Sequence, residues 1–313
     1  EEIKENKLCK NFFIDIRDEK KIKKVILEIK PEIVFHLAAQ SLVRESYKNP
    51  LATWTTNLSG SLNLLDSLMP LKNVCAVIMV TTDKVYKNRE WEYGYRENDP
   101  LGGIDPYSSS KAACEIAISS WRSSFCGNNI NQSSTLAIAS ARSGNVIGGG
   151  DWAIDRIIPD TIHWLRNEKK LLIRNKNATR PWQHTLEPLS GYILLAEKLY
   201  KEQNTKKENE SNIFSTSFNF GPYNTSNRTV QELINEIKKS WSSDRTIFYE
   251  KDIFHEAGLL NLQIDKAYRK LKWTPKWDFE NTVSKTINWY KKFYENKSMA
   301  YKLCLDDIES YMK

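Results

Sequence analysis

Apolar positions in the first half of the chain form short continuous runs separated by longer stretches with helical spacing. The runs at 32–37, 74–80 and 136–141 are typical of strands buried on both faces of a parallel sheet. The stretches at 50–65 and 106–125 predict helices, and a proline stands near the start of each. This alternation predicts βαβ units and an α/β fold with a Rossmann-like, doubly wound parallel sheet.

After Gly150 the pattern loosens, and it predicts a smaller mixed α/β domain. We expect helices at 157–166, 188–200 and 229–241, and a strand near 214–220. The stretch 201–212 is polar and mixed in charge, which favours an exposed loop. We therefore expect a sheet domain at 1–148 and a second domain at 149–313, with segments around 181–220 returning to the sheet.

Composition limits the classes of protein that need to be considered. The 313 residues are 40% hydrophobic and 27% charged, enough for one sizeable core and a second lobe. The net charge of +7 favours phosphorylated anions, but no basic run is long enough to predict a nucleic-acid partner. We see no membrane-length apolar stretch and no signal peptide, and we expect a cytoplasmic protein without a membrane partner.

Cysteine and histidine give no indication of a disulfide framework or a metal site. The five cysteines are odd in number and widely spaced, which favours free buried thiols. The four histidines show no ligand spacing on a shared helix face. We therefore expect no bound metal.

Three polar residues follow the apolar run 74–80. Thr82, Asp83 and Lys84 supply a hydroxyl, a carboxylate and an ammonium at the predicted carboxyl end of a strand, where open α/β sheets bind their ligands. The alternative is an ordinary polar exit from a strand into a loop.

Tyr107 and Lys111 lie one turn apart at the start of the predicted helix 106–125. Asp105 can cap this helix, and Pro106 suits its first position. A free tyrosine has a pKa of about 10, and a nearby ammonium and the helix N-terminus both favour the phenolate. Tyr107 is thus a candidate base for a sugar or alcohol hydroxyl. The alternative is a surface pair, because the Tyr-x-x-x-Lys pattern is common by chance.

Together these motifs resemble the extended short-chain dehydrogenase/reductase superfamily and, within it, the nucleotide-sugar 4,6-dehydratases. The segments 81–86, 144–153 and 180–184 are most similar to the members that act on CDP-glucose. The resemblance implies CDP-glucose as the small-molecule substrate, NAD as the cofactor, and a homo-oligomer, either a dimer or a tetramer. It also implies that 1–148 binds NAD and that 149–313 mainly binds substrate.

The resemblance implies a lyase reaction in deoxysugar biosynthesis. Tyr107, held anionic by Lys111, would take the proton from the hydroxyl at carbon 4, and Thr82 would hydrogen-bond the same oxygen. Asp83 would act as the acid for loss of the hydroxyl at carbon 6. Lys84 stands where related dTDP-glucose enzymes carry a glutamate, and it can be the base at carbon 5 only if its pKa is lowered.

Other positions are carried over from the family pattern. The expected cofactor-binding residues are Asp15, Ile16, Leu37, Ala38, Ala39, Gln40, Asn57, Tyr107, Lys111 and Ser143. The expected substrate-binding residues are Asn145, Arg156 and Arg180, with the two guanidinium groups suited to a diphosphate. Tight packing of small residues and a solvated Arg156 are the alternatives.

One expected motif is missing from the start of the chain. No glycine-rich turn between a strand and a helix precedes 10–18, and residue 1 is Glu1 rather than methionine. We therefore expect a truncated first βαβ unit. Three hypotheses remain open: a dehydratase, a related epimerase or reductase, and an inactive remnant that lacks the pyrophosphate-binding turn.

Overall fold

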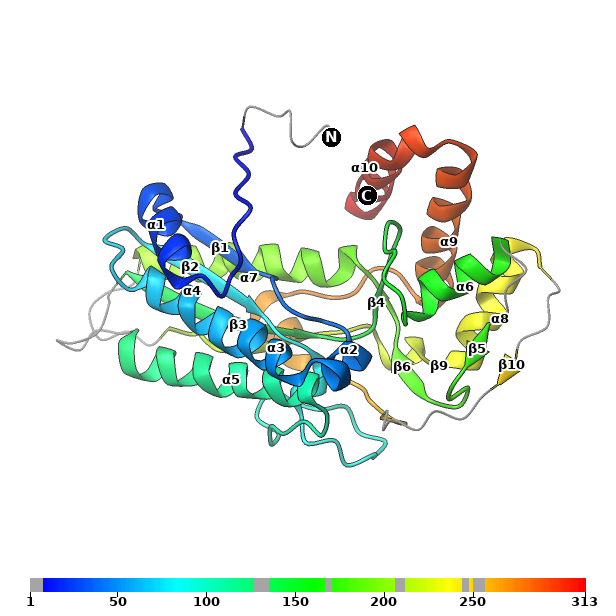
Figure 1. Cartoon of the computed structure of the whole chain (residues 1–313), viewed down its shortest axis with the longest axis horizontal. Coiled ribbons are helices and arrows are strands. Elements are labelled where there is room, and N and C mark those ends of the chain that lie inside the picture. The colour runs from blue at the N-terminus through cyan, green and yellow to red at the C-terminus, as the bar shows by residue number, and fades with distance from the viewer. Residues whose placement is uncertain (1–7, 127–134, 167–170, 206–211, 244–247, 250–256) are drawn as a thin grey trace.

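A four-stranded parallel sheet forms the centre of the first part of the molecule (Figure 1). This computed structural model describes residues 8–126, 135–166, 171–205, 212–243, 248–249 and 257–313. The strand order is β1-β2-β3-β8. The strands are β1 (Ile33–His36), β2 (Cys75–Val80), β3 (Leu136–Ser143) and β8 (Ser217–Phe220). The predicted α/β class with a parallel sheet is confirmed.

Helices cover both faces of this sheet, which explains the unbroken apolar runs of β2 and β3. Val77 and Met79 pack with α1, α4 and α5 on one face, whereas Ala76 and Ile78 pack with α7 on the other. The covering helices are α1 (Glu19–Ile29), α4 (Gly60–Leu68), α5 (Pro106–Phe125) and α7 (Leu186–Thr205). The sheet is therefore doubly wound.

The predicted helix at 50–65 belongs to a longer, interrupted helical region. It comprises α2 (Val43–Lys48), α3 (Pro50–Trp54), a π-helical turn (Thr55–Ser59) and α4. The π-helical turn places buried Asn57 next to the loop that follows β1. Short helical turns also occur at Asp83–Val85, Asn224–Ser226, Ala267–Leu271 and Lys297–Met299.

A second hydrophobic core lies to one side of the sheet, at the right in Figure 1. We call this part the second lobe. Its helices are α6 (Ile157–Arg166), α8 (Val230–Trp241), α9 (Phe279–Glu295) and α10 (Ala300–Met312). Its strand pairs are β4 (Val146–Ile147) with β7 (Gln183–His184), β5 (Leu172–Ile173) with β10 (Phe248–Tyr249), and β6 (Thr179–Pro181) with β9 (Asn227–Thr229).

Part of the predicted loop at 201–212 is wrong. Helix α7 continues to Thr205, with Thr205 donating its hydroxyl to the Lys201 carbonyl, because polar residues on an exposed helix face carry no apolar periodicity. Residues 206–211 lie outside the described residues. Helices α1, α9 and α10 were not predicted, although Asp18 caps α1 and accepts from the Lys21 backbone N–H.

In the described part of the chain, no helix combines the length and apolar character needed to cross a membrane.

Candidate functional site

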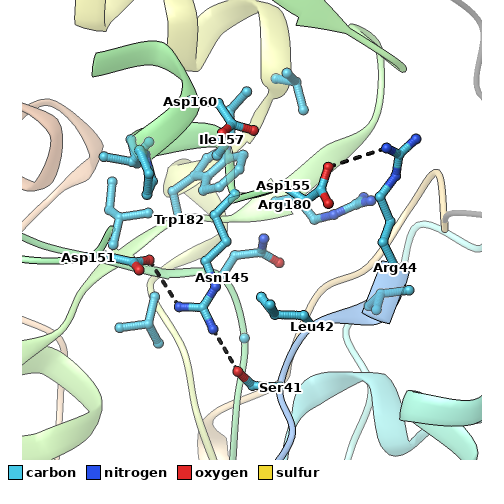
Figure 2. Close-up of a pocket in the computed structure, with 18 of the residues that line it drawn as sticks. Ser41, Leu42, Arg44, Asn145, Asp151, Asp155, Ile157, Asp160, Arg180 and Trp182 are labelled. Carbon is cyan, nitrogen blue, oxygen red and sulfur yellow. Dashed lines mark hydrogen bonds and ion pairs between the residues drawn. The ribbon is translucent and has the colours of Figure 1, made fainter. Parts of the chain in front are cut away.

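A cavity of about 930 Å³ opens at the carboxyl ends of β2 and β3, where the sheet meets the second lobe. Its sheet-side lining includes Thr82, Asp83, Lys84, Tyr107, Ser143 and Asn145. Its second-lobe lining includes Asp151, Asp155, Arg156, Arg180 and Trp182. Figure 2 shows Asn145 between the loop that carries Ser41 and the second-lobe side chains. The cavity thus joins most of the predicted catalytic and substrate-binding residues.

Asp83 is fully buried at the floor of this cavity. Its Oδ1 accepts a hydrogen bond from the Thr82 hydroxyl at 2.9 Å and contacts Lys84 Nζ at 3.5 Å. Its Oδ2 has no hydrogen-bond partner among the described residues. A buried carboxylate oxygen without a partner is costly, so this atom is a candidate contact for a ligand hydroxyl.

Gly144 makes room for that carboxylate. A Cβ atom at this position would lie 1.8 Å from Asp83 Oδ2 and 2.1 Å from its Cγ. The Gln183 side chain amide donates to the Gly144 carbonyl at 3.0 Å, which fixes the backbone beside the carboxylate. Asn145, the next residue, has the left-handed φ of 41° that asparagine tolerates better than most residues.

Helix α5 begins as its sequence predicts. Asp105 accepts from the Ser108 backbone N–H at 2.9 Å, the Ser108 hydroxyl completes a capping box, and Pro106 occupies the first helical position. This start places Tyr107 in the first turn, where it lines the cavity. Lys111 lies one turn later and is buried.

The predicted lowering of the Tyr107 pKa is wrong for this arrangement. Burial raises the pKa of Tyr107 to about 12, and the Thr82 hydroxyl beside it acts in the opposite direction without cancelling the effect. Burial also lowers the pKa of Lys111. The Lys111 ammonium donates to the Val80 carbonyl at 3.3 Å rather than to the phenol.

Arginine side chains line the part of the cavity nearer the second lobe. Arg156 donates to Asp151 Oδ2 at 2.9 Å and to the Ser41 hydroxyl at 2.8 Å. Arg180 is buried and donates to the Thr179 carbonyl at 2.8 Å. These contacts hold both predicted diphosphate-binding groups against the cavity.

Arg44 also lines the cavity, and sequence reasoning missed it. Its guanidinium lies 3.3 Å from Asp155, a contact drawn in Figure 2. This pair joins helix α2 to the second lobe, and the bond from Arg156 to Ser41 joins the preceding loop to it. Only the fold brings these segments together, so no local pattern in the sequence pointed to Arg44.

Helix α9 supports the segment that carries these acidic residues. The Tyr290 hydroxyl donates to the Asp151 carbonyl at 2.6 Å, and Trp152 packs edge-on against the Tyr290 ring. Gly149 lies against Trp289, where a Cβ would come within 2.1 Å of the indole. Close packing of the glycine segment on an aromatic helix face thus fixes the backbone at Asp151.

Of the ten residues expected to bind the cofactor, Tyr107 and Ser143 line the cavity and the other eight, Lys111 included, do not. Asp15 is exposed and paired with Arg17, whose hydrogen bonds lower the Asp15 pKa to about 2. Ile16 packs against Gly60, and the segment 37–40 is exposed or half-buried. Buried Asn57 accepts a hydrogen bond from the Gln40 backbone N–H and donates one to the Gln40 carbonyl. These two bonds fix the backbone at the end of this segment.

The Tyr107 end of the site fits the ribose end of a dinucleotide. Among the described residues, the Lys111 ammonium makes one hydrogen bond, to the Val80 carbonyl, which leaves donors for a ligand hydroxyl. Ser143 lines the cavity nearby and pairs its hydroxyl with that of Tyr192. Within the described ranges, no group of three or more His, Cys, Asp or Glu side chains is arranged to hold a metal ion.

This fold and site define a Rossmann-like protein of the nucleotide-sugar epimerase and dehydratase class. A UDP-glucose 4-epimerase from Thermotoga maritima, solved with UDP-glucose, matches 90% of this chain and 84% of its own, with a TM-score of 0.74 and 22% identity. A dTDP-glucose 4,6-dehydratase from Streptomyces venezuelae, solved with NAD, matches 93% and 81%, with a TM-score of 0.74 and 21% identity. At these identities the likeness concerns the fold.

The chain belongs to the GDP-mannose 4,6 dehydratase family, whose sequence profile matches residues 1–286. A CDP-glucose 4,6-dehydratase from Salmonella typhimurium is 42% identical over 309 residues, covering 98% of this chain and 83% of the relative. A dTDP-D-glucose 4,6-dehydratase from Mus musculus is 25% identical, covering 89% and 73%. The predicted membership among the nucleotide-sugar 4,6-dehydratases is confirmed.

Proposed function

We propose that this chain converts CDP-glucose to CDP-4-keto-6-deoxyglucose and water. The observation that carries the proposal is the single cavity lined by both Tyr107 and Asp83, so that one hexose can reach the phenol and the carboxylate. The 42% identity to the Salmonella relative supports CDP-glucose over other nucleotide sugars. NAD bound at the Tyr107 end of the cavity would supply the hydride acceptor for carbon 4 and the hydride donor for carbon 6.

In the first step, Tyr107 accepts the proton from the hydroxyl at carbon 4. The Thr82 hydroxyl lies beside the phenol and donates to Asp83 Oδ1 in the ligand-free chain, and it can turn from that carboxylate to donate to the same sugar oxygen. Since burial raises the pKa of Tyr107 to about 12, the phenol needs a cationic neighbour in the working complex before it can act as a base. Lys111, one turn away, is the group that can turn toward it.

In the second step, the Asp83–Lys84 pair supplies the acid and the base. Asp83 donates a proton to the departing hydroxyl of carbon 6, while Lys84 takes the proton from carbon 5. This leaves a carboxylate and an ammonium, the pair whose atoms lie 3.5 Å apart in the structure. When hydride returns to carbon 6, the Lys84 ammonium gives a proton to carbon 5. Asp83 then regains a proton from solvent, and Tyr107 releases the proton that it took from the hydroxyl at carbon 4, so all three groups are restored for the next turnover.

Arg156 and Arg180 bind the diphosphate of the substrate. Arg156 currently bonds Asp151 and Ser41, and a diphosphate can replace those partners with charge-assisted bonds of fixed geometry. Asn145, with a buried side-chain oxygen that lacks a partner among the described residues, reaches the substrate between the two ends of the cavity.

The test is turnover of CDP-glucose by the purified chain with added NAD. We expect the alkali-induced absorbance of a 4-keto sugar, and one solvent hydrogen incorporated at carbon 5. Matched reactions with dTDP-glucose, UDP-glucose and GDP-mannose measure the preference for the cytidine nucleotide. An epimerase would form a 4-epimer without exchange at carbon 5, and that product would overturn the proposal.

Three further predictions accompany this function. NAD is the expected cofactor, and calorimetry that detects tight NAD binding would contradict the inactive-remnant hypothesis.

The chain is expected to divide near residue 148 into a cofactor-binding domain and a substrate-binding domain. A dimer or tetramer in the cytoplasm is expected, and light scattering of the purified chain measures the oligomeric state.

A further inference from the structure

A buried carboxylate that does not line the cavity lies behind the catalytic residues. Glu115 is 1% exposed and is placed on α5, one turn after Lys111 and two turns after Tyr107. The three side chains therefore share one face of the helix. The proposed mechanism uses Tyr107 and Lys111 but gives Glu115 no role.

Each of these three side chains contacts one of three consecutive residues at the end of β2. Lys111 Nζ donates to the Val80 carbonyl, Glu115 Oε1 accepts from the Thr81 hydroxyl at 2.5 Å, and the Thr82 hydroxyl lies beside the Tyr107 phenol. Glu115 thus holds Thr81, which directly precedes Thr82, the residue whose hydroxyl must meet the reacting oxygen.

The other carboxylate oxygen of Glu115, Oε2, is hydrogen-bonded to side chains of β3. Oε2 accepts from Arg142 Nη2 at 2.7 Å and from the Ser140 hydroxyl at 2.9 Å, both on β3. Burial alone would raise the pKa of Glu115, but Arg142 and these hydrogen bonds outweigh burial and hold the pKa below its usual value. The carboxylate is therefore a fixed anion that joins α5 to β2 and β3 at once.

We propose that Glu115 is a positioning residue of the dehydratase, which through Thr81 sets the separation between the Thr82 hydroxyl and the Tyr107 phenol. This inference rests on the proposed function for its kinetic consequence. The effect of the Glu115–Thr81 bond on the position of the Thr82 hydroxyl does not depend on the substrate. Both reacting hydroxyls must meet one sugar oxygen, and a small displacement of either lowers the rate strongly.

Thr81→Val is the sharpest test, because it removes the bond to Thr81 and leaves the buried ion pair between Glu115 and Arg142 intact. Direct removal of Glu115 would leave Arg142 as an uncompensated buried charge, which threatens folding. We expect Thr81→Val to lower kcat about tenfold and to leave KM for CDP-glucose within about twofold, because the arginine contacts are elsewhere. Thr81→Ser keeps the hydroxyl and should restore kcat.

Thr286→Val is the matched control, since Thr286 is a fully buried threonine of α9 whose hydroxyl donates to the Thr282 carbonyl. Its kcat should be unchanged. Crystals of Thr81→Val should show the Thr82 hydroxyl displaced relative to the Tyr107 phenol when compared with crystals of the unaltered chain. A Thr81→Val variant with wild-type kcat and an unmoved Thr82 would overturn the positioning role. Failure of the unaltered chain to dehydrate CDP-glucose would instead overturn the proposed function, and the crystals would still decide this inference.

Discussion

The two ends of the cavity are built in different ways. At the catalytic end, Asp83 is fully buried, its hydrogen-bond and charge partners Thr82 and Lys84 are adjacent in sequence, and Gly144 packs against its carboxylate. At the arginine end, the Arg156–Asp151 and Arg44–Asp155 pairs are roughly one-third exposed. The catalytic end is held rigid by packing, whereas the arginine end can exchange its carboxylate partners for a ligand at low cost.

This difference predicts that changes at the catalytic end lower kcat and that changes at the arginine end raise KM.

The largest effect is expected for Asp83→Asn. The amide keeps the shape of the side chain but cannot donate the proton to the departing hydroxyl, so kcat should fall by about 10²–10⁴-fold. Steady-state kinetics with CDP-glucose measures this. Because Asp83 lies beside Lys84 rather than the arginines, KM should change little. A kcat close to wild type would remove Asp83 from the mechanism.

A somewhat smaller effect is expected for Gly144→Ala. The new methyl group would overlap the Asp83 carboxylate, so that side chain must move, and kcat should fall by roughly 10²-fold. Gly221→Ala is the matched control, because the nearest atom to its added Cβ is 3.5 Å away. Equal losses in the two variants would show that general destabilisation, rather than displacement of Asp83, causes the effect.

At the arginine end, Arg156→Gln should raise KM for CDP-glucose about tenfold with kcat within about twofold, since it removes charge-assisted bonds to the diphosphate. Arg269→Gln, an exposed arginine outside the cavity lining, should leave both constants unchanged. A tenfold loss of kcat in Arg156→Gln would instead show that the two ends are coupled.

The smallest effect is expected at Tyr107. In the ligand-free chain, its side chain should contribute no phenolate absorbance near neutral pH. Burial raises its pKa to about 12, so the protonated phenol persists as pH rises through the usual tyrosine range. The measurement is the ultraviolet difference spectrum between the unaltered chain and Tyr107→Phe. The same difference spectrum, measured between the unaltered chain and Tyr93→Phe, which removes an exposed phenol, shows whether a single phenolate can be detected. Ionisation of Tyr107 near pH 7 without ligand would contradict the environment described here.

Sequence patterns located the catalytic end well because its determinants are local. The apolar run of β2 predicts a strand, and the polar residues directly after it fall at the strand's carboxyl end. The cap and proline before Tyr107 fix the start of α5 within one residue. Helices α1, α9 and α10 were not predicted, although their sequences have amphipathic spacing.

The tertiary structure alone decided what surrounds those motifs. Arg44 and Asp155 are 111 residues apart, and Arg156 and Ser41 are 115 apart, so no local pattern could pair them. The protonation state of Tyr107 also depends on burial, which reverses the effect expected from its spacing to Lys111. Short-range sterics and capping determine which residues form strands and helices, whereas solvent exclusion and long-range packing determine how their charges behave.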